Sequence, residues 1–403
     1  MAQTQNGGRS GGTALLLWVV FINVGCVATL WPVLAPYAQS LGAGGVGIGV
    51  VVGAIYATRI LIGPWIGRLG DRYGYRELLL FGNALYVLIA LAYWAADSVV
   101  TLTAARLLHG VGSAIVLPMV MTVLGRHAAG KSGAAMGRFN LAQWMGYAIG
   151  PLAGGALAAQ FQPSAVFFAL IPAGVISTFL VLGVDRRYTA PEDSSSEQAK
   201  KEAPKDARAQ LLLGYNFIVA PSNLIIMSFF PLLADTRGYG PVITGALLAI
   251  AAFVTAAAQP VWGRIADQTS VKPLLVTGGI GAVLGLALLG GTEPIWVAAI
   301  AMLIAGFAIA GLVAGTATAA VELGRSRGMG TYVALFHSSG SLGQALMPLL
   351  YGAVMGIIGV DGLLIAVGVL VVMLSGAFVL ASTVLAPRDE PDPLSSPEAR
   401  ESN

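Results

Sequence analysis

Long apolar segments recur along almost the whole chain, and they limit more than any other feature how this sequence can fold. Each has about the 20 residues that an α-helix needs to cross a bilayer. We count twelve, at 14–37, 46–68, 77–96, 99–125, 134–160, 164–184, 209–234, 241–265, 273–291, 294–321, 328–356 and 362–385. With 56% hydrophobic and 10% charged residues, the composition excludes an ordinary soluble domain. We therefore expect an all-α membrane protein with twelve transmembrane helices.

Polar stretches divide these segments into two groups of six. Residues 185–208 include PEDSSSEQAKKEAPKD and contain few apolar side chains, which is typical of a flexible linker. The stretch 386–403 is similar, and residues 1–13 are polar and glycine-rich. The sequence therefore predicts six-helix bundles at 14–184 and 209–385, joined by the linker and flanked by two short tails.

Basic residues gather in alternate loops. Of the 22 basic residues, only Arg237 lies in a loop on the opposite side, and only Arg59 and Arg106 lie deep within a helix. Lys and Arg favour the cytoplasmic side of a membrane. We therefore expect both tails and the linker to be cytoplasmic, in a plasma (inner) membrane.

A ten-residue motif, GRLGDRYGYR at 67–76, separates the second and third segments, and a weaker copy, GRIADQTSVK, follows 196 residues later at 263–272. It fits Gly-x-x-x-Asp-Arg-x-Gly-x-Arg. Here the chain resembles the major facilitator superfamily, whose loop between helices 2 and 3 carries this motif. The resemblance implies two parallel six-helix repeats, with a substrate cavity between them near the membrane midplane. It also implies a conformational switch formed by Gly67, Asp71, Arg72, Gly74, Arg76, Gly263 and Asp267.

The residues of the motif suit a switch that changes shape. Gly67 would let helix backbones approach closely, and Gly74 can take the positive φ of a tight turn. Asp71 can cap a neighbouring helix or pair with an arginine. We expect this latch to hold one conformation and to be released in the other.

Other segments of the two halves also match. WPVLAPYAQSLG ends the first segment and FFPLLADTRGYG ends the seventh. Three residues of the fifth segment, Gly146, Pro151 and Gly155, correspond to Gly343, Pro348 and Gly352 of the eleventh segment. Each pair is separated by the same 197 positions. An internal duplication explains a constant offset better than chance does.

A glycine pattern in the fifth segment, GRFNLAQWMGYAIGPLAGG at 137–155, resembles the helix-5 motif of the family's proton-linked antiporters, including drug exporters. Glycines recurring every fourth residue form a bare helix face, and a proline can bend the helix. The alternative is a generic packing face of small residues, which membrane helices often have. The motif residues are Gly137, Gly146, Gly150, Pro151, Gly154 and Gly155.

Two arginines at membrane depth are the clearest functional candidates. Arg106 begins RLLHGVGSAIVLP, which resembles the family's Arg-x-x-x-Gly-x-Gly motif, and Arg59 lies nine residues before Arg68. Buried arginine is costly in a membrane and usually faces a partner or a cavity. Arg106 could act as a structural or proton-relay residue and Arg59 could bind an anion. Alternatively, both could simply bind backbone carbonyls.

No acidic residue lies deep in a predicted helix, and the first helix offers only Asn23 as a deep polar group. This disfavours a strictly cationic substrate and leaves the proton carrier open among Asp71, His109 and His337. Each histidine alone is more often a hydrogen-bonded packing residue. The pathway candidates are Asn23, Tyr56, Arg59, Arg106, His109, Asn140, Gln143, Trp144, Asn216, Asn223 and His337.

These patterns predict a secondary transporter that exports a small organic molecule, neutral or anionic, in exchange for protons, working as a monomer in the bilayer. Uptake or facilitated diffusion of a metabolite is the alternative, and a non-transporting receptor or scaffold is a second one. One stretch, GRHAAGKS at 125–132, fits Gly-x-x-x-x-Gly-Lys-Ser/Thr, but it joins two apolar segments and follows no predicted strand, so it does not predict an ATP site. We predict no enzymatic activity, no metal, no cofactor other than the proton gradient, and no nucleic-acid partner.

Overall fold

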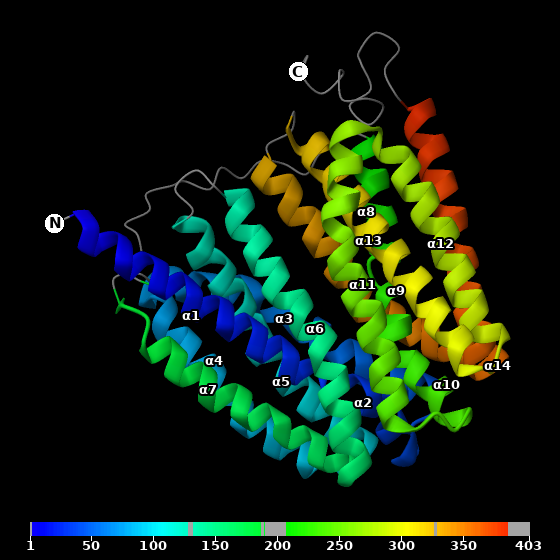
Figure 1. The fold of residues 1–403 in the computed structure, drawn as a ribbon, viewed down its shortest axis with the longest axis horizontal. Helices are drawn as coiled ribbons and strands as arrows, with labels where there is room; N and C mark the ends of the chain where they lie inside the picture. The colour runs from blue at the N-terminus through cyan, green and yellow to red at the C-terminus, as the bar shows by residue number, and fades with distance from the viewer. Residues whose placement is uncertain (1, 128–131, 187–188, 190–206, 326–328, 386–403) are drawn as a thin grey trace. The chain divides into compact units, whose positions relative to one another are not determined.

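The computed structural model describes the chain except for residues 1, 128–131, 187–188, 190–206, 326–328 and 386–403. Most of the predicted linker and the whole C-terminal tail therefore lie outside the described residues. In the described part, all regular structure is helical, as Figure 1 shows. Within the described residues, ten segments are long and apolar enough to cross a membrane, so the chain is an integral multi-pass membrane protein.

The chain divides into two compact units. Unit 1 comprises Met1–Glu197 with Gly238–Ala249, and unit 2 comprises Gln198–Arg237 with Ile250–Asn403. The elements before the linker are α1 (Ala2–Ala28), α2 (Trp31–Ser40), α3 (Gly45–Tyr73), α4 (Tyr75–Trp94), α5 (Val99–Arg126), α6 (Ser132–Gln160), η1 (Pro163–Ala169) and α7 (Leu170–Leu182). Those after it are α8 (Ala207–Val219), α9 (Ser222–Leu224), a π-helix η3 (Ile225–Phe229), α10 (Phe230–Thr236), α11 (Gly240–Gln268), α12 (Val271–Gly291), α13 (Ile295–Arg325) and α14 (Met329–Val384).

The all-α membrane fold is confirmed, whereas the count of twelve spans stays a prediction. The last of the ten candidate spans, Leu335–Val384, has 50 residues. It is interrupted at Gly359, whose φ of 74° is not helical. Helix α6 has 29 residues but is not one of the ten, because its stripe of glycine and polar residues lowers its hydropathy.

Several helix boundaries differ from those expected. Helix α1 begins at Ala2 instead of residue 14, although its membrane-crossing stretch begins only at Gly11. The predicted seventh segment is one candidate span, Ala207–Thr236, but its helix is interrupted, since α8 ends at Val219 and α9 begins after Pro221. Proline has no N–H to donate and ends the regular ladder there.

Contacts in the two units show the same repeat that the sequence predicts. A Cβ added at Gly110 of α5 would lie 2.8 Å from the Ile55 carbonyl oxygen of α3. One added at Gly306 of α13 would lie 2.5 Å from the Ala251 carbonyl oxygen of α11. Both residues of the second pair follow their counterparts by 196 positions. Each unit thus uses a glycine to bring equivalent helices to backbone contact.

The motif at 67–76 is largely helical, and the expectation of a loop is wrong. Helix α3 continues through it to Tyr73, because no proline interrupts this stretch, and Gly74 then ends the helix with a φ of 93°. The expected positive φ of Gly74 is confirmed. The expected close approach at Gly67 is wrong, since a Cβ there would meet nothing within 4 Å. The tight glycine is Gly70, where a Cβ would lie 2.8 Å from Met119 Sδ.

Arg76 has a structural partner at the start of α4. Its Nη2 donates to the carbonyl oxygen of Leu182, the last residue of α7, at 2.9 Å. A cation at a helix C-terminus is favoured by the helix dipole. Arg72, in contrast, is exposed beside the ring of Tyr73. The motif thus fastens α4 to α7, while the side chains of Asp71 and Asp267 lie outside the described residues.

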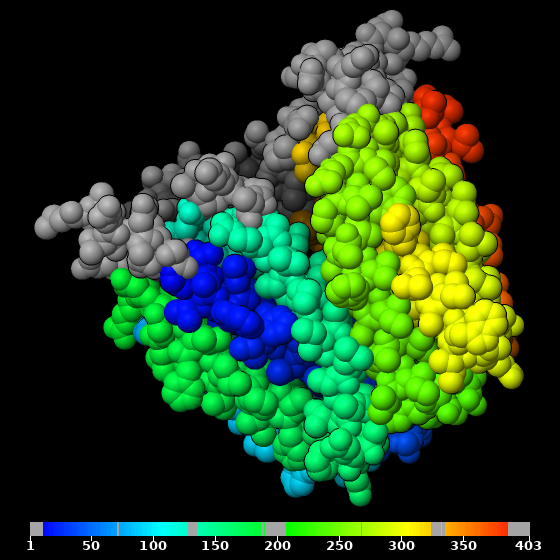
Figure 2. All heavy atoms as spheres, in the orientation of Figure 1, coloured from blue at the N-terminus to red at the C-terminus, as the bar shows by residue number. Residues whose placement is uncertain are grey.

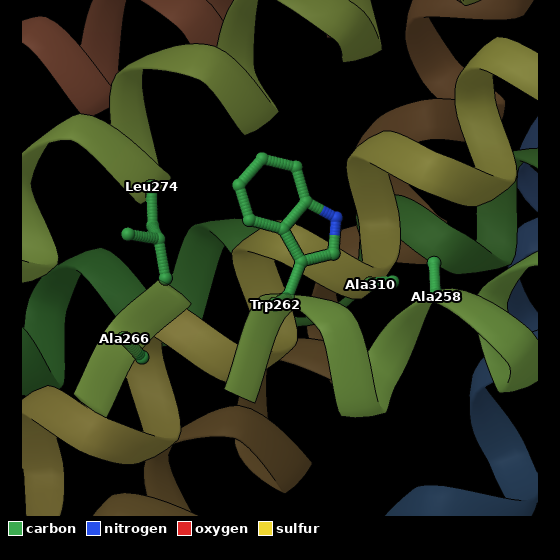
Figure 3. Close-up of a cluster of buried hydrophobic side chains, with 5 residues drawn as sticks. All are labelled: Ala258, Trp262, Ala266, Leu274 and Ala310. Carbon is green, nitrogen blue, oxygen red and sulfur yellow. The ribbon is translucent and has the colours of Figure 1, made fainter. Parts of the chain in front are cut away.

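The second copy of the motif is preceded by a buried tryptophan. Trp262 Nε1 donates to the Phe307 carbonyl oxygen at 3.0 Å. Figure 3 shows the indole with Leu274 on one side and Ala310 on the other. A Cβ added at Gly263, the first residue of the copy, would meet nothing within 4 Å. Trp262 therefore anchors the end of α11 against α12 and α13.

Candidate functional site

The two deep arginines of unit 1 have different surroundings. Arg106 on α5 is 6% exposed. Its Nε donates to the Val51 carbonyl oxygen at 2.9 Å, its Nη2 to the Val52 carbonyl oxygen at 3.2 Å, and its Nη1 to Tyr93 Oη at 3.4 Å. These bonds tie α5 to α3 and α4. The geometry therefore favours the structural alternative for Arg106.

Arg59, on α3, is half-buried. It makes no hydrogen bond or ion pair with any residue that the structure describes, and its one ring contact is with Tyr56, whose centroid lies 5.8 Å from Cζ. Its charge acts on Tyr86, His109 and Tyr147, which belong to α4, α5 and α6. The guanidinium donors are therefore unused on the described residues.

Aromatic rings from two further elements lie close to one another, and one of them, Tyr147, lies within reach of the charge of Arg59. Tyr147 on α6 has its ring centroid 4.9 Å from that of Trp31 on α2 and 5.5 Å from that of Trp144. Gln143 Nε2 donates to Tyr147 Oη at 3.5 Å. Together with Tyr56 and Arg59, these residues form what we call the Arg59 cluster: Trp31, Tyr56, Arg59, Gln143, Trp144 and Tyr147.

His109 is enclosed by tyrosines. It is fully buried, and its Nδ1 lies 2.9 Å from Tyr93 Oη. Its ring meets Tyr86 and Tyr93 edge to face. The second ring nitrogen, Nε2, is buried without a hydrogen-bond partner among the described residues. These contacts agree with a packing histidine, and its role as a proton carrier stays a prediction.

The amide candidates of unit 1 lie in different surroundings. Asn23 is buried, and its Nδ2 lies within hydrogen-bond distance of Ser177 Oγ at 2.8 Å and Asn83 Oδ1 at 3.2 Å. These residues join α1 to α7 and α4, so Asn23 links helices instead of adjoining the Arg59 cluster. Asn140, by contrast, is exposed on α6.

The candidates of unit 2 are also dispersed. Asn216 Nδ2 donates to the Phe336 carbonyl oxygen at 2.7 Å and to Ser339 Oγ at 3.1 Å, which links α8 to α14. Asn223 lies in α9, after the break at Pro221, so the two asparagines do not belong to one continuous helix. His337 is exposed on α14 beside the ring of Phe336.

The glycine stripe of α6 lies against the backbone of α1. A Cβ at Gly146 would lie 2.9 Å from the Phe21 carbonyl oxygen, and one at Gly150 would lie 2.6 Å from Ala28 Cβ. A Cβ at Gly154 would collide with the Thr29 carbonyl oxygen. Figure 2 shows the two helices side by side on this face of unit 1, α1 in blue and α6 in blue-green. The predicted close packing is confirmed for these three glycines.

The outer members of the glycine motif differ from one another. Gly155 also makes a close approach, to the Pro241 carbonyl oxygen of the same unit. Gly137 has nothing within 4 Å of an added Cβ. The close-packed part of the motif therefore begins at Gly146.

Some residues of the site could not be singled out from the sequence. Tyr93 is identified by its contact with Arg106, and Trp31 by its contact with Tyr147. Arg237, which the sequence marks only as a basic residue on the unexpected side, binds the carbonyl oxygens of Leu289, Gly290 and Thr292 and pairs with Asp361 at 2.7 Å. Among the described residues, no three His, Cys, Asp or Glu side chains gather as metal ligands.

Comparison with known proteins identifies the family of this chain and several relatives. The sequence matches the family described as the Major Facilitator Superfamily over residues 16–328 and 211–403. Multidrug resistance protein 2 of Bacillus subtilis (strain 168) is 24% identical over 289 residues, covering 68% of this chain and 72% of that protein. The methyl viologen resistance protein SmvA of Salmonella typhimurium (strain LT2) is 29% identical over 192 residues, covering 46% and 37%.

A similar fold is found among solved structures. A bacterial homologue of the human lysosomal transporter Spinster superposes with a TM-score of 0.78 at 16% sequence identity, covering 94% of this chain and 97% of that one. At this identity the likeness concerns the fold alone.

Proposed function

This chain belongs to the Major Facilitator Superfamily, and from that premise we propose that it is a proton-coupled exporter of a small organic molecule, neutral or anionic. It is a transporter that works by alternating access as a monomer. It lies in the plasma (inner) membrane, with both termini in the cytoplasm. The names of relatives, multidrug resistance protein 2 among them, support export.

The observation that carries this proposal is the contact between α6 and α1. Gly146, Gly150 and Gly154 bring the two helices to backbone distance, in the segment that resembles the antiporter motif. Small residues on a helix face let the backbone of a neighbouring membrane helix approach closely. Such a contact is compatible with a transporter that alternates between two conformations.

Transport from proteoliposomes tests the proposal. The purified chain is reconstituted with a fluorescent compound panel inside, and release is followed with and without an imposed pH gradient. We expect release to accelerate when the outside is acidic, since export is then driven by protons entering. A protonophore should abolish the acceleration.

Facilitated diffusion, the second candidate, gives a different result. Release would then follow the compound's own gradient and would be the same with and without the pH difference. A non-transporting receptor would release nothing above protein-free liposomes. Either result would overturn proton-coupled export.

A further inference from the structure

In the Arg59 cluster, the cation has no hydrogen-bond acceptor among the described residues and lies beside the ring of Tyr56. A guanidinium has five N–H donors and no acceptor. Arg106, one helix away, uses its donors on two carbonyl oxygens and a tyrosine hydroxyl. Arg59 uses none on the described residues. Arg59 is half-buried, and a partly desolvated charge is costly when unpaired, so its site favours an anion that the described part of the chain does not supply.

No carboxylate in the described part of unit 1 is placed to be that anion. Between residues 1 and 186 the acidic residues are Asp71, Glu77, Asp97 and Asp185, and all lie at helix ends. The nearest along α3 is Asp71, twelve residues after Arg59, which is about 18 Å at 1.5 Å per residue. The counter-charge must therefore come from outside these helices.

The neighbours of Arg59 indicate what else the anion carries. Tyr56 lies beside the guanidinium, and the rings of Trp31, Trp144 and Tyr147 contact one another. Aromatic faces bind other aromatic rings by offset or edge-on stacking. The planar fork of an arginine matches a carboxylate, which accepts two parallel hydrogen bonds.

We propose that the Arg59 cluster is the subsite for an aromatic carboxylate, with the carboxylate on Arg59 and the ring among Trp31, Trp144 and Tyr147. Gln143 and the hydroxyls of Tyr56 and Tyr147 supply further polar contacts to substituents on the ring. This inference rests on the proposed transport function, because it names the class of molecule carried.

Binding to the purified full chain in lipid nanodiscs, without any gradient, tests the subsite. The probes are 2-naphthoate, its uncharged amide 2-naphthamide, the non-aromatic cyclohexanecarboxylate, sodium sulfate, and the cation methyl viologen. The variants are Arg59→Gln, Arg59→Lys and, as a matched control on the same helix, Arg68→Gln. Arg68 is exposed and contacts only the ring of Trp65 among the described residues.

We expect the wild type to bind 2-naphthoate about tenfold or more tightly than the amide, since a charge-assisted bidentate bond is lost. It should also prefer 2-naphthoate to cyclohexanecarboxylate. Arg59→Gln should abolish the preference for the acid over the amide, Arg59→Lys should restore part of it, and Arg68→Gln should leave it unchanged. Equal binding of acid and amide by the wild type, or a preference that survives Arg59→Gln, would overturn the proposal. So would binding of sulfate or methyl viologen as tight as that of 2-naphthoate.

A second measurement excludes a folding defect. Because Arg59 makes no hydrogen bond with the described residues, Arg59→Gln should not lower the melting temperature of the ligand-free protein. A lowered melting temperature would show that Arg59 serves the fold and would contradict the subsite. The proposed transport function is tested separately. If 2-naphthoate binds as expected but the pH gradient drives no release from proteoliposomes, the subsite is supported and proton-coupled export is contradicted.

Discussion

Substitution of Gly150 measures how much stability and transport depend on the close contact between α6 and α1. An ideal Cβ at this position lies 2.6 Å from Ala28 Cβ and 3.1 Å from the Ala28 carbonyl carbon. Carbon atoms in contact are normally about 3.5–4.0 Å apart, so Gly150→Ala requires α1 to move away by about 1 Å. Such overpacking costs about 1–3 kcal/mol, and Gly150→Leu, with three further carbons, should cost more.

The matched control is Gly137→Ala on the same helix. An added Cβ there meets nothing within 4 Å, so only the intrinsic helix preference for alanine acts, which favours alanine by about 1 kcal/mol. That preference is common to both variants. The difference between their free energies of unfolding should therefore equal the overpacking cost at Gly150, about 1–3 kcal/mol.

Denaturant titration of the purified variants in one detergent measures this difference, and the proteoliposome assay measures transport. We expect Gly137→Ala to transport normally, Gly150→Ala to be slowed, and Gly150→Leu to be inactive or leaky. A shift of about 1.4 kcal/mol changes a conformational ratio tenfold, so the loss of transport should exceed the loss of folded protein. Equal stability of the two alanine variants would refute the packing argument, and normal transport by Gly150→Leu would show that this contact does not govern transport.

Three further predictions concern charged residues. Asp71→Asn should slow transport without weakening substrate binding, because Asp71 lies about 18 Å along α3 from Arg59; unchanged transport rates by correctly inserted protein would contradict a switch. Arg106→Gln and Arg106→Lys should both lower the melting temperature, because neither side chain can reproduce a forked contact with two carbonyl oxygens; a stable Arg106→Gln protein that has lost proton coupling would instead show a relay. Asp361→Asn should lower the free energy of unfolding by about 1 kcal/mol or less, since this carboxylate is 56% exposed. Arg237→Gln should lower it more, because three carbonyl oxygens lose their donor. Equal unfolding free energies for the two variants would show that the ion pair dominates.

The sequence alone determined the features that depend on local pattern. Long apolar segments predict membrane helices because the bilayer leaves backbone groups no other partners, and the described segments are helical as expected. Glycines at every fourth residue predict a bare helix face, and the structure shows α1 on it. The 196-residue offset predicts a duplication, and Gly110 and Gly306 make matching contacts in the two units.

Only the tertiary structure decided which residues have partners. Arg59 and Arg106 are alike in sequence terms, two cations deep in apolar helices. Arg106 is satisfied because the carbonyl oxygens of Val51 and Val52 and the hydroxyl of Tyr93 lie within its reach. Arg59 has no such acceptors among the described residues and lies beside the ring of Tyr56 instead. Hydrogen-bond partners come from other helices, and helical periodicity within one segment carries no information on which helix lies opposite.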